Sequence, residues 1–270
     1  MFSFTSLEGI LERVGDRLRA FLTMVYRQTR RFLRSKSRII GMILNPIIWI
    51  VFFGIGWSRI FKGPMEIFGG VDYLTFLAPG IFAMTIFNQS FISGVSVIWD
   101  KEFGFLKEIM VAPVSRLSIV LGRTAGNATT ALIQGILILA ISAVMGFRPS
   151  GIVGLVLSVV FMLLIATTFI GLGLIFASNM EDMHGFSLIM NFVIFPIFFL
   201  SGALFPIENL PEWIIKICYV NPLTYGVDGL RGTLVGVSSF PIAVDILLST
   251  VFSIVMVLLG AYFFKKSESV

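Results

Sequence analysis

The chain has 270 residues, of which 57% are hydrophobic and 13% charged, and its formal net charge is +5. Soluble domains carry roughly 45–50% apolar and about 25% charged residues, so this composition excludes a water-soluble domain. It predicts instead an all-α integral membrane protein, in agreement with a mean hydropathy of +0.97. The one cysteine and one histidine exclude a structural zinc site, which needs about four such ligands.

Residues 1–38 form a basic segment without a continuous apolar run. Apolar residues recur at spacings of three and four from Leu7 to Val25, which predicts a helix with one apolar face. Arginines such as Arg13 and Arg30 mostly fall outside that face. A helix of this kind beside a span is typical of one that lies in the membrane interface, although a helix packed on protein gives the same pattern.

Six apolar stretches follow, and together they predict one transmembrane domain over residues 39–267. A membrane-spanning helix needs about 20 residues. The expected spans are residues 39–57, 76–97, 120–145, 152–176, 186–204 and 243–264.

The segment after the second span predicts a short cytoplasmic helix. Charged and apolar residues alternate between Asp100 and Met110, and Pro113 ends the pattern. An aromatic and acidic knob of this kind suits docking into a cleft of a soluble partner. A helix lying flat on the membrane surface explains the pattern equally well.

The connection between the fifth and sixth spans, residues 205–242, is long and still rich in apolar residues. Its prolines divide it into two expected helices, residues 212–220 and 223–235, and neither is long enough to span. We expect them to form a re-entrant or interfacial hairpin on the outer face, where irregular backbone must be buried in protein or face water.

The distribution of Lys and Arg predicts the orientation of the chain. These residues are concentrated before the first span, after the second span and at the C-terminal end, whereas the opposite side has few, among them Lys216 and Arg231. Because cytoplasmic loops carry the excess of positive charge, both termini are expected in the cytoplasm of a multi-pass protein of the cell membrane.

The expected spans carry amides such as Asn45 and Gln134 and almost no ionisable group, since only Arg123 and Asp245 approach a span and both lie near its ends. This disfavours an ion-coupled carrier, which usually places charged side chains inside its bundle. A Gly-Lys dipeptide, required by the phosphate-binding loop, does not occur in the chain. If ATP drives this protein, another polypeptide binds it.

Three ordered motifs resemble the ABC-2 type permease family. They are the run from Asp100 to Glu108 with the Ala-Pro-Val-Ser-Arg that ends at Arg116, the run from Phe199 to Pro206, and the run from Asn221 to Arg231. The resemblance is greatest to the prokaryotic half-size branch with drug and lipooligosaccharide exporters. It implies a second permease half, expected to be an identical copy, and separate ATPase subunits that hold ATP and Mg²⁺.

The resemblance also implies roles for particular residues. Residues 1–38 would contain the family's elbow helix. The ATPase-coupling residues would be Asp100, Lys101, Glu102, Phe103, Gly104, Phe105, Lys107 and Glu108, with a second contact at Glu181 and Asp182. The substrate path would include Phe87, Asn88, Phe91, Asn191 and Phe195.

The expected function is export of an amphipathic drug-like, lipid-like or glycolipid cargo by a subunit that is not itself an enzyme. No metal, cofactor or nucleic acid is expected on this chain. A stand-alone secondary carrier or channel is the alternative, and a membrane anchor without a transport role is a third possibility.

Overall fold

The computed structural model describes Arg19 and residues 22–56, 65–93, 116–144, 151–180 and 183–267. All regular elements within these ranges are helical, which confirms the expected fold class for this part of the chain. The expected coupling residues, Asp100–Glu108 with Glu181 and Asp182, lie outside the described residues.

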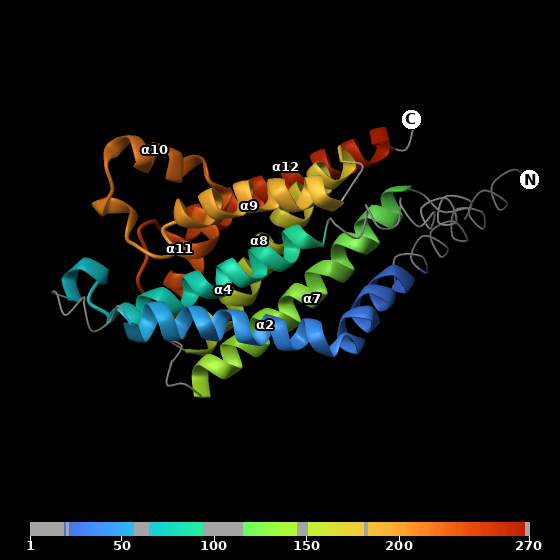
Figure 1. Cartoon of the computed structure of the whole chain (residues 1–270). Helices are drawn as coiled ribbons and strands as arrows, with labels where there is room; N and C mark the ends of the chain where they lie inside the picture. The colour runs from blue at the N-terminus through green and yellow to red at the C-terminus, as the bar shows by residue number, and fades with distance from the viewer. Residues whose placement is uncertain are drawn as a thin grey trace, which may run out of the picture.

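The helices form an elongated bundle with short elements gathered at one end (Figure 1). A helix over residues 22–34 comes first. The elements that follow, in chain order, are α2 (Lys36–Trp49), the π-helix η1 (Ile50–Ile55), the 3₁₀ helix η2 (Met65–Phe68), α4 (Tyr73–Ile92), α7 (Arg116–Val144), α8 (Ile152–Ser178), α9 (Met183–Phe199), the 3₁₀ helix η3 (Ile207–Asn209), α10 (Glu212–Val220), α11 (Pro222–Val235) and α12 (Ile242–Ser267).

Helix α8 is central to the packing and contacts α4, α7, α11 and α12. Its contact with α12 depends on glycine. A Cβ placed on Gly171 would lie 2.5 Å from the backbone of Met256, and one on Gly260 would lie 2.9 Å from the Gly171 carbonyl oxygen. Small residues let helix backbones approach closely, which is how helices associate where lipid removes the hydrophobic driving force.

Aromatic side chains fill the space between α4, α8 and α9. The Phe87 ring lies 4.3 Å from that of Phe169 on α8, and the Phe91 ring lies 5.8 Å from that of Phe186 on α9. All four side chains are buried. Phenylalanine has no polar group to satisfy, so this core needs no hydrogen-bond partners and joins three helices by ring packing.

Three helices are long and apolar enough to cross a membrane: α4, α8 and α12. The bent pair formed by helix 22–34 and residues 39–53 would add a fourth if it counts as one span. Helices α7 and α9 contain shorter apolar segments, Thr124–Ala140 and Gly185–Phe199. The described residues therefore provide three to four candidate spans, and the count of six stays a prediction.

The fifth apolar stretch ends sooner than its hydropathy predicts. It was expected to run to residue 204, but α9 ends at Phe199. Gly202 adopts a positive φ of 72°, and the Ser201 hydroxyl donates to the Phe198 carbonyl oxygen at 2.6 Å. A left-handed glycine and a local side-chain bond both end a helix, whatever the apolarity of the residues that follow.

The two short helices expected before the last span are present as α10 and α11. The turn between them is fixed by Asn221, whose side chain accepts from the backbone N–H of Leu223 and donates to the Ile197 carbonyl oxygen at 2.6 Å. Pro222 at the first helical position suits the start of α11, because its missing N–H would have no partner there. The turn is thus attached to α9.

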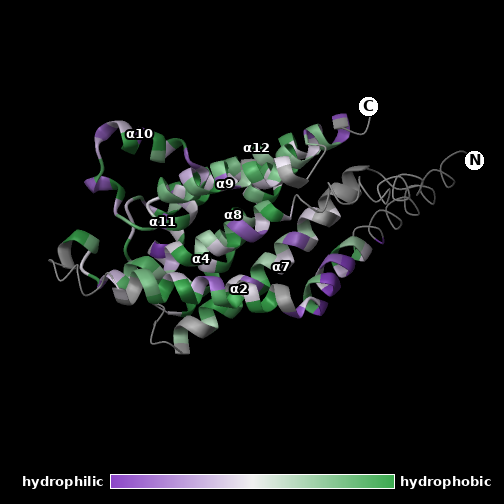
Figure 2. Ribbon diagram, in the orientation of Figure 1, coloured by the Kyte–Doolittle hydropathy of each residue, from purple (hydrophilic) through white to green (hydrophobic). Residues whose placement is uncertain are grey.

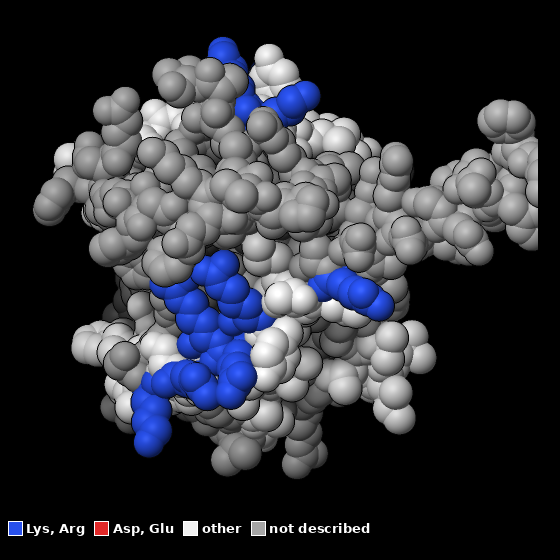
Figure 3. All heavy atoms as spheres, turned by 90° about the vertical axis from the view of Figure 1, so that its right-hand side faces the viewer, with Lys and Arg blue, Asp and Glu red and all other residues white. Residues whose placement is uncertain are grey.

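One end of the bundle is basic. Hydrophobic residues run along most of the bundle, and hydrophilic ones gather on helix 22–34 (Figure 2). The end that carries helix 22–34 and the close of α12 shows Lys and Arg and no acidic side chain of the described residues (Figure 3). The exposed basic residues of these two segments are Arg30, Arg31, Arg34, Lys265 and Lys266, and the exposed Lys36 follows at the start of α2.

Candidate functional site

The expected substrate-path residues on α4 point into the bundle. Phe87 and Phe91 have no exposed surface, because rings from α8 and α9 cover them. Asn88 is half-buried, and its Oδ1 meets no hydrogen-bond donor within the described residues. The α4 residues therefore support the packing of α9 in this conformation.

The expected path residues on α9 lie on an open face. Asn191 is exposed, and Phe195 is 48% exposed. Apolar neighbours at helical spacing extend this face, and they are Leu188, Phe192 and Phe199. The structure thus separates the five predicted path residues into an interior group on α4 and an exposed group on α9.

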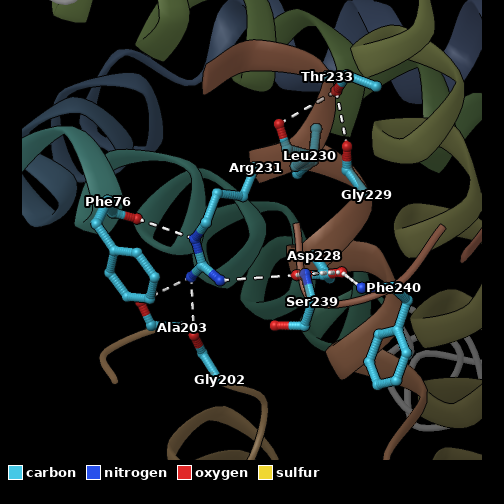
Figure 4. Close-up of polar contacts among 10 residues, drawn as sticks. All are labelled: Phe76, Gly202, Ala203, Asp228, Gly229, Leu230, Arg231, Thr233, Ser239 and Phe240. Carbon is cyan, nitrogen blue, oxygen red and sulfur yellow. Dashed lines mark hydrogen bonds and ion pairs between the residues drawn. The ribbon is translucent and has the colours of Figure 1, made fainter. Parts of the chain in front are cut away.

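A buried arginine joins three segments at the end of the bundle that carries α10 and α11 (Figure 4). The Arg231 side chain donates from Nε to the Phe76 carbonyl oxygen at 3.2 Å and from Nη2 to the Gly202 carbonyl oxygen at 2.8 Å. Its guanidinium carbon lies 3.7 Å from the centre of the Phe76 ring. One side chain of α11 therefore holds the first turn of α4 and the turn after α9.

Asp228 lies one turn before Arg231 and holds a different segment (Figure 4). Its carboxylate accepts from the backbone N–H of Ser239 at 2.9 Å and from that of Phe240 at 2.8 Å. Its Oδ1 is 4.0 Å from Nη1 of Arg231. Asp228 thereby fixes the loop that leads into α12, and the two opposite charges partly compensate each other.

Burial governs the electrostatics of this pair, which lies outside the candidate spans. Burial raises the pKa of Asp228, while the N–H groups of Ser239 and Phe240 and the Arg231 guanidinium act in the opposite direction. Burial lowers the pKa of Arg231 to about 10, against the effect of Asp228 and Glu208. The guanidinium therefore keeps its charge at neutral pH.

A cavity of about 290 Å³ opens beside this pair. Its polar lining includes Glu208 and Asn209 from η3 and Ser238 and Ser239 from the loop before α12. Its apolar lining comes from Ile67, Phe68, Phe76, Pro206 and Val237. The cavity thus gathers residues from three stretches that are distant in the sequence, residues 67–76, 206–209 and 228–239.

Sequence reasoning placed Asp228 and Arg231 in a motif but did not predict that they are buried together. The available signal was their spacing of three residues, which puts both side chains on one face of a helix. The charge count had assigned Arg231 only to the outer side. Its partners, Phe76 and Gly202, are separated from it by 155 and 29 residues, so no local pattern could identify them.

A second buried acid, Asp245, lies in the first turn of α12. Its side chain has no exposed surface, and neither carboxylate oxygen meets a hydrogen-bond donor within the described residues. Ser249, one turn later, is also buried with an unpartnered hydroxyl in the same part of the structure. These groups place polar atoms on the inner side of an otherwise apolar helix.

Comparisons with known proteins agree with the motifs. The model of the ABC-2 type transporter family matches residues 19–235. This chain belongs to the ABC-2 type transporter family. The matched region ends with the last residue of α11, so it contains the buried Asp228–Arg231 pair and leaves α12 outside.

Relatives of this ABC-2 chain include named permeases. A putative transport permease, ycf38, of Cyanophora paradoxa is 33% identical over 75% of this chain and 70% of its own length. The inner membrane transport permease YadH of Escherichia coli K12 is 27% identical over 88% of this chain and 89% of its own length. A daunorubicin resistance ABC transporter permease protein, DrrB1, of Streptomyces coeruleorubidus is 24% identical over 82% of this chain and 77% of its own length. The chain is therefore a membrane transport permease.

Proposed function

We propose that this permease is the membrane subunit of an ATP-driven exporter, with ATP hydrolysed by a separate ABC subunit. Family membership over residues 19–235 is the observation that carries the proposal. The cargo would be an amphipathic drug-like, lipid-like or glycolipid molecule, and the relative named for daunorubicin resistance supports the drug-like class. Binding of ATP and Mg²⁺ is assigned to the partner.

The proposed topology has six spans and cytoplasmic termini. Helices α7 and α9 and the α2–η1 unit would complete the set that α4, α8 and α12 begin. The basic helix 22–34 and the end of α12 lie at the same end of the bundle, which supports an even number of crossings (Figure 1). The concentration of Lys and Arg at that end supports its cytoplasmic location (Figure 3).

The proposed substrate path uses the exposed face of α9. Asn191 offers an amide and Phe195 an aromatic surface to a second half, while Phe91 supports α9 from behind through Phe186. A path between two copies of the chain would be mainly apolar with few polar groups, which suits an amphipathic cargo.

The test is transport by the chain reconstituted in vesicles with a candidate ABC ATPase. We expect Glu102→Gln and Phe105→Ala to reduce ATP-dependent export at least tenfold while membrane insertion is unchanged. Glu212→Gln, a matched loss of charge on the exposed helix α10, should retain export. Coupled export at the parent rate in a Glu102/Phe105 double variant would contradict the coupling assignment.

The alternative, a secondary carrier that works alone, is favoured by one observation. Asp245 is a buried acid in a candidate span whose carboxylate oxygens meet no hydrogen-bond donor within the described residues, and buried acids in spans often mark ion pathways. Export by the purified chain without any ATPase, lost in Asp245→Asn, would support the carrier. Export that requires both ATP and the ATPase would exclude it.

A further inference from the structure

The cavity beside Arg231 has the volume and the hydrogen-bond donors that suit the polar headgroup of a lipid. Its volume of about 290 Å³ lies at the lower limit of ligand pockets, which are roughly 300–1,000 Å³. It therefore has room for a small polar group and not for a whole amphiphile. The exposed Ile67 borders it, so an attached chain could continue over apolar surface.

The hydrogen-bond donors of the cavity are partly unused. Arg231 has partners on Nε and Nη2, but its Nη1 is 4.0 Å from Asp228, beyond hydrogen-bonding distance. Within the part of the chain that the structure describes, Nη1 makes no hydrogen bond. Asn209 and the hydroxyls of Ser238 and Ser239 add neutral donors. These groups suit the oxygens of a phosphate.

The charge balance of the cavity selects against a simple anion. The negative charge of Asp228 offsets the positive charge of Arg231. The Asp228 carboxylate also already accepts hydrogen bonds from the N–H groups of Ser239 and Phe240. Glu208 lines the same cavity, is exposed and acts on Arg231 together with Asp228, so two carboxylates face one guanidinium and leave an excess of negative charge. A ligand that pairs with the Glu208 carboxylate must carry a positive group as well as a group for the donors.

We propose that this cavity binds the phosphoethanolamine headgroup of a zwitterionic membrane lipid. The phosphate would face Nη1 of Arg231 and the serine hydroxyls, and the primary ammonium would bind Glu208. An ammonium with three N–H donors hydrogen-bonds a carboxylate, whereas the trimethylammonium of choline has none to donate. The site is independent of the proposed export function, because lipid binding needs neither ATP nor an ATPase.

Competitive lipid binding to the full-length chain in detergent tests the proposal. Short-chain phosphatidylethanolamine, phosphatidylcholine and phosphatidylglycerol with identical acyl chains are offered together, and bound lipid is counted by native mass spectrometry. We expect the ethanolamine lipid to bind about tenfold more tightly than the choline lipid, the effect of one charge-assisted hydrogen-bonded contact. Soluble phosphoethanolamine should compete, and phosphocholine should compete about tenfold more weakly.

Two matched variants locate the site. Glu208→Gln should reduce the preference for ethanolamine over choline to within about twofold, whereas Glu212→Gln, on the neighbouring exposed helix, should leave it unchanged. Ser238→Ala should weaken both lipids equally, because it removes a phosphate contact. Unchanged thermal unfolding in lipid-free detergent shows that each variant is folded.

Three outcomes would overturn the assignment. Equal binding of the ethanolamine and choline lipids would show that Glu208 does not bind the primary ammonium. Tightest binding of phosphatidylglycerol would indicate an anion site. Displacement by a diacylglycerol of the same chain length, as effective as displacement by phosphoethanolamine, would show that acyl chains alone are bound.

Discussion

Two regions of this permease are held together by opposite means. Helices α8 and α12 meet through glycines, with Gly171 and Gly260 at the contact. The turns at the α10–α11 end meet through a buried charged pair, Asp228 and Arg231. The difference has its cause in the backbone. Regular helices satisfy their own backbone hydrogen bonds, whereas turns leave carbonyl groups that need a donor from elsewhere.

The turn after α9 contains carbonyl groups that depend on a side-chain donor. The carbonyl groups of Gly202 and Ala203 lie in a non-helical segment, and the Arg231 side chain donates to both. In the α8–α12 contact no such carbonyl needs a donor, and close packing supplies the attraction instead. Four predictions test this difference, from the largest expected effect to the smallest.

Arg231→Met should have the largest effect. The change leaves the Asp228 carboxylate buried without its counter-charge and removes the donors to Phe76 and Gly202. Loss of one partner of a buried pair costs about 3–5 kcal/mol. The measurement is the free energy of unfolding in detergent. Lys216→Met, an exposed change on α10, is the control, and a loss below about 1 kcal/mol for Arg231→Met would show that the pair is dispensable.

Gly171→Ala should be next. The added Cβ would meet the Met256 backbone at 2.5 Å, so α8 and α12 must separate, at a cost of about 1–3 kcal/mol. Gly41→Ala is the matched control, since a Cβ there meets nothing within 4 Å. That change should be neutral or stabilise by up to about 1 kcal/mol. Equal effects of the two variants on thermal unfolding would refute glycine-dependent packing.

Asn221→Ala should cost about 1–2 kcal/mol. It removes the cap of α11 and the bond to the Ile197 carbonyl oxygen, which lies in α9. Because the turn between α10 and α11 then loosens, limited proteolysis near residue 221 should become faster as unfolding becomes easier. Asn45→Ala, at an exposed amide in α2, should change stability by less than about 0.5 kcal/mol. Protection from protease equal to the parent would count against the capping role.

Ser253→Ala should have the smallest effect. Its hydroxyl lies 2.6 Å from that of Thr167 and joins α12 to α8. Interhelical hydrogen bonds in membrane proteins average about 0.6 kcal/mol. A double-mutant cycle with Thr167→Ala, followed by unfolding in detergent, measures the coupling. A coupling above about 2 kcal/mol would mean that polar contacts, and not glycine packing, dominate this helix pair.

The sequence predicted the parts of the fold that depend on local pattern. The long apolar runs located α8 and α12 within three residues at each end, and the prolines at 211 and 222 placed α10 and α11. The end of α9 was predicted less well, because hydropathy continues through the turn at Gly202. The coupling segment at Asp100–Glu108 lies outside the described residues and stays a prediction.

By itself the sequence determined the membrane class, the helical composition and the family. These follow from composition, from the length of apolar runs and from short motifs, all of which act locally along the chain. Only the tertiary structure decided that Phe87 and Phe91 are interior, that Asn191 is exposed, and that Arg231 is a buried donor. The physical reason is that burial and pairing depend on neighbours such as Phe76, which lies 155 residues from Arg231 and is brought beside it by folding alone.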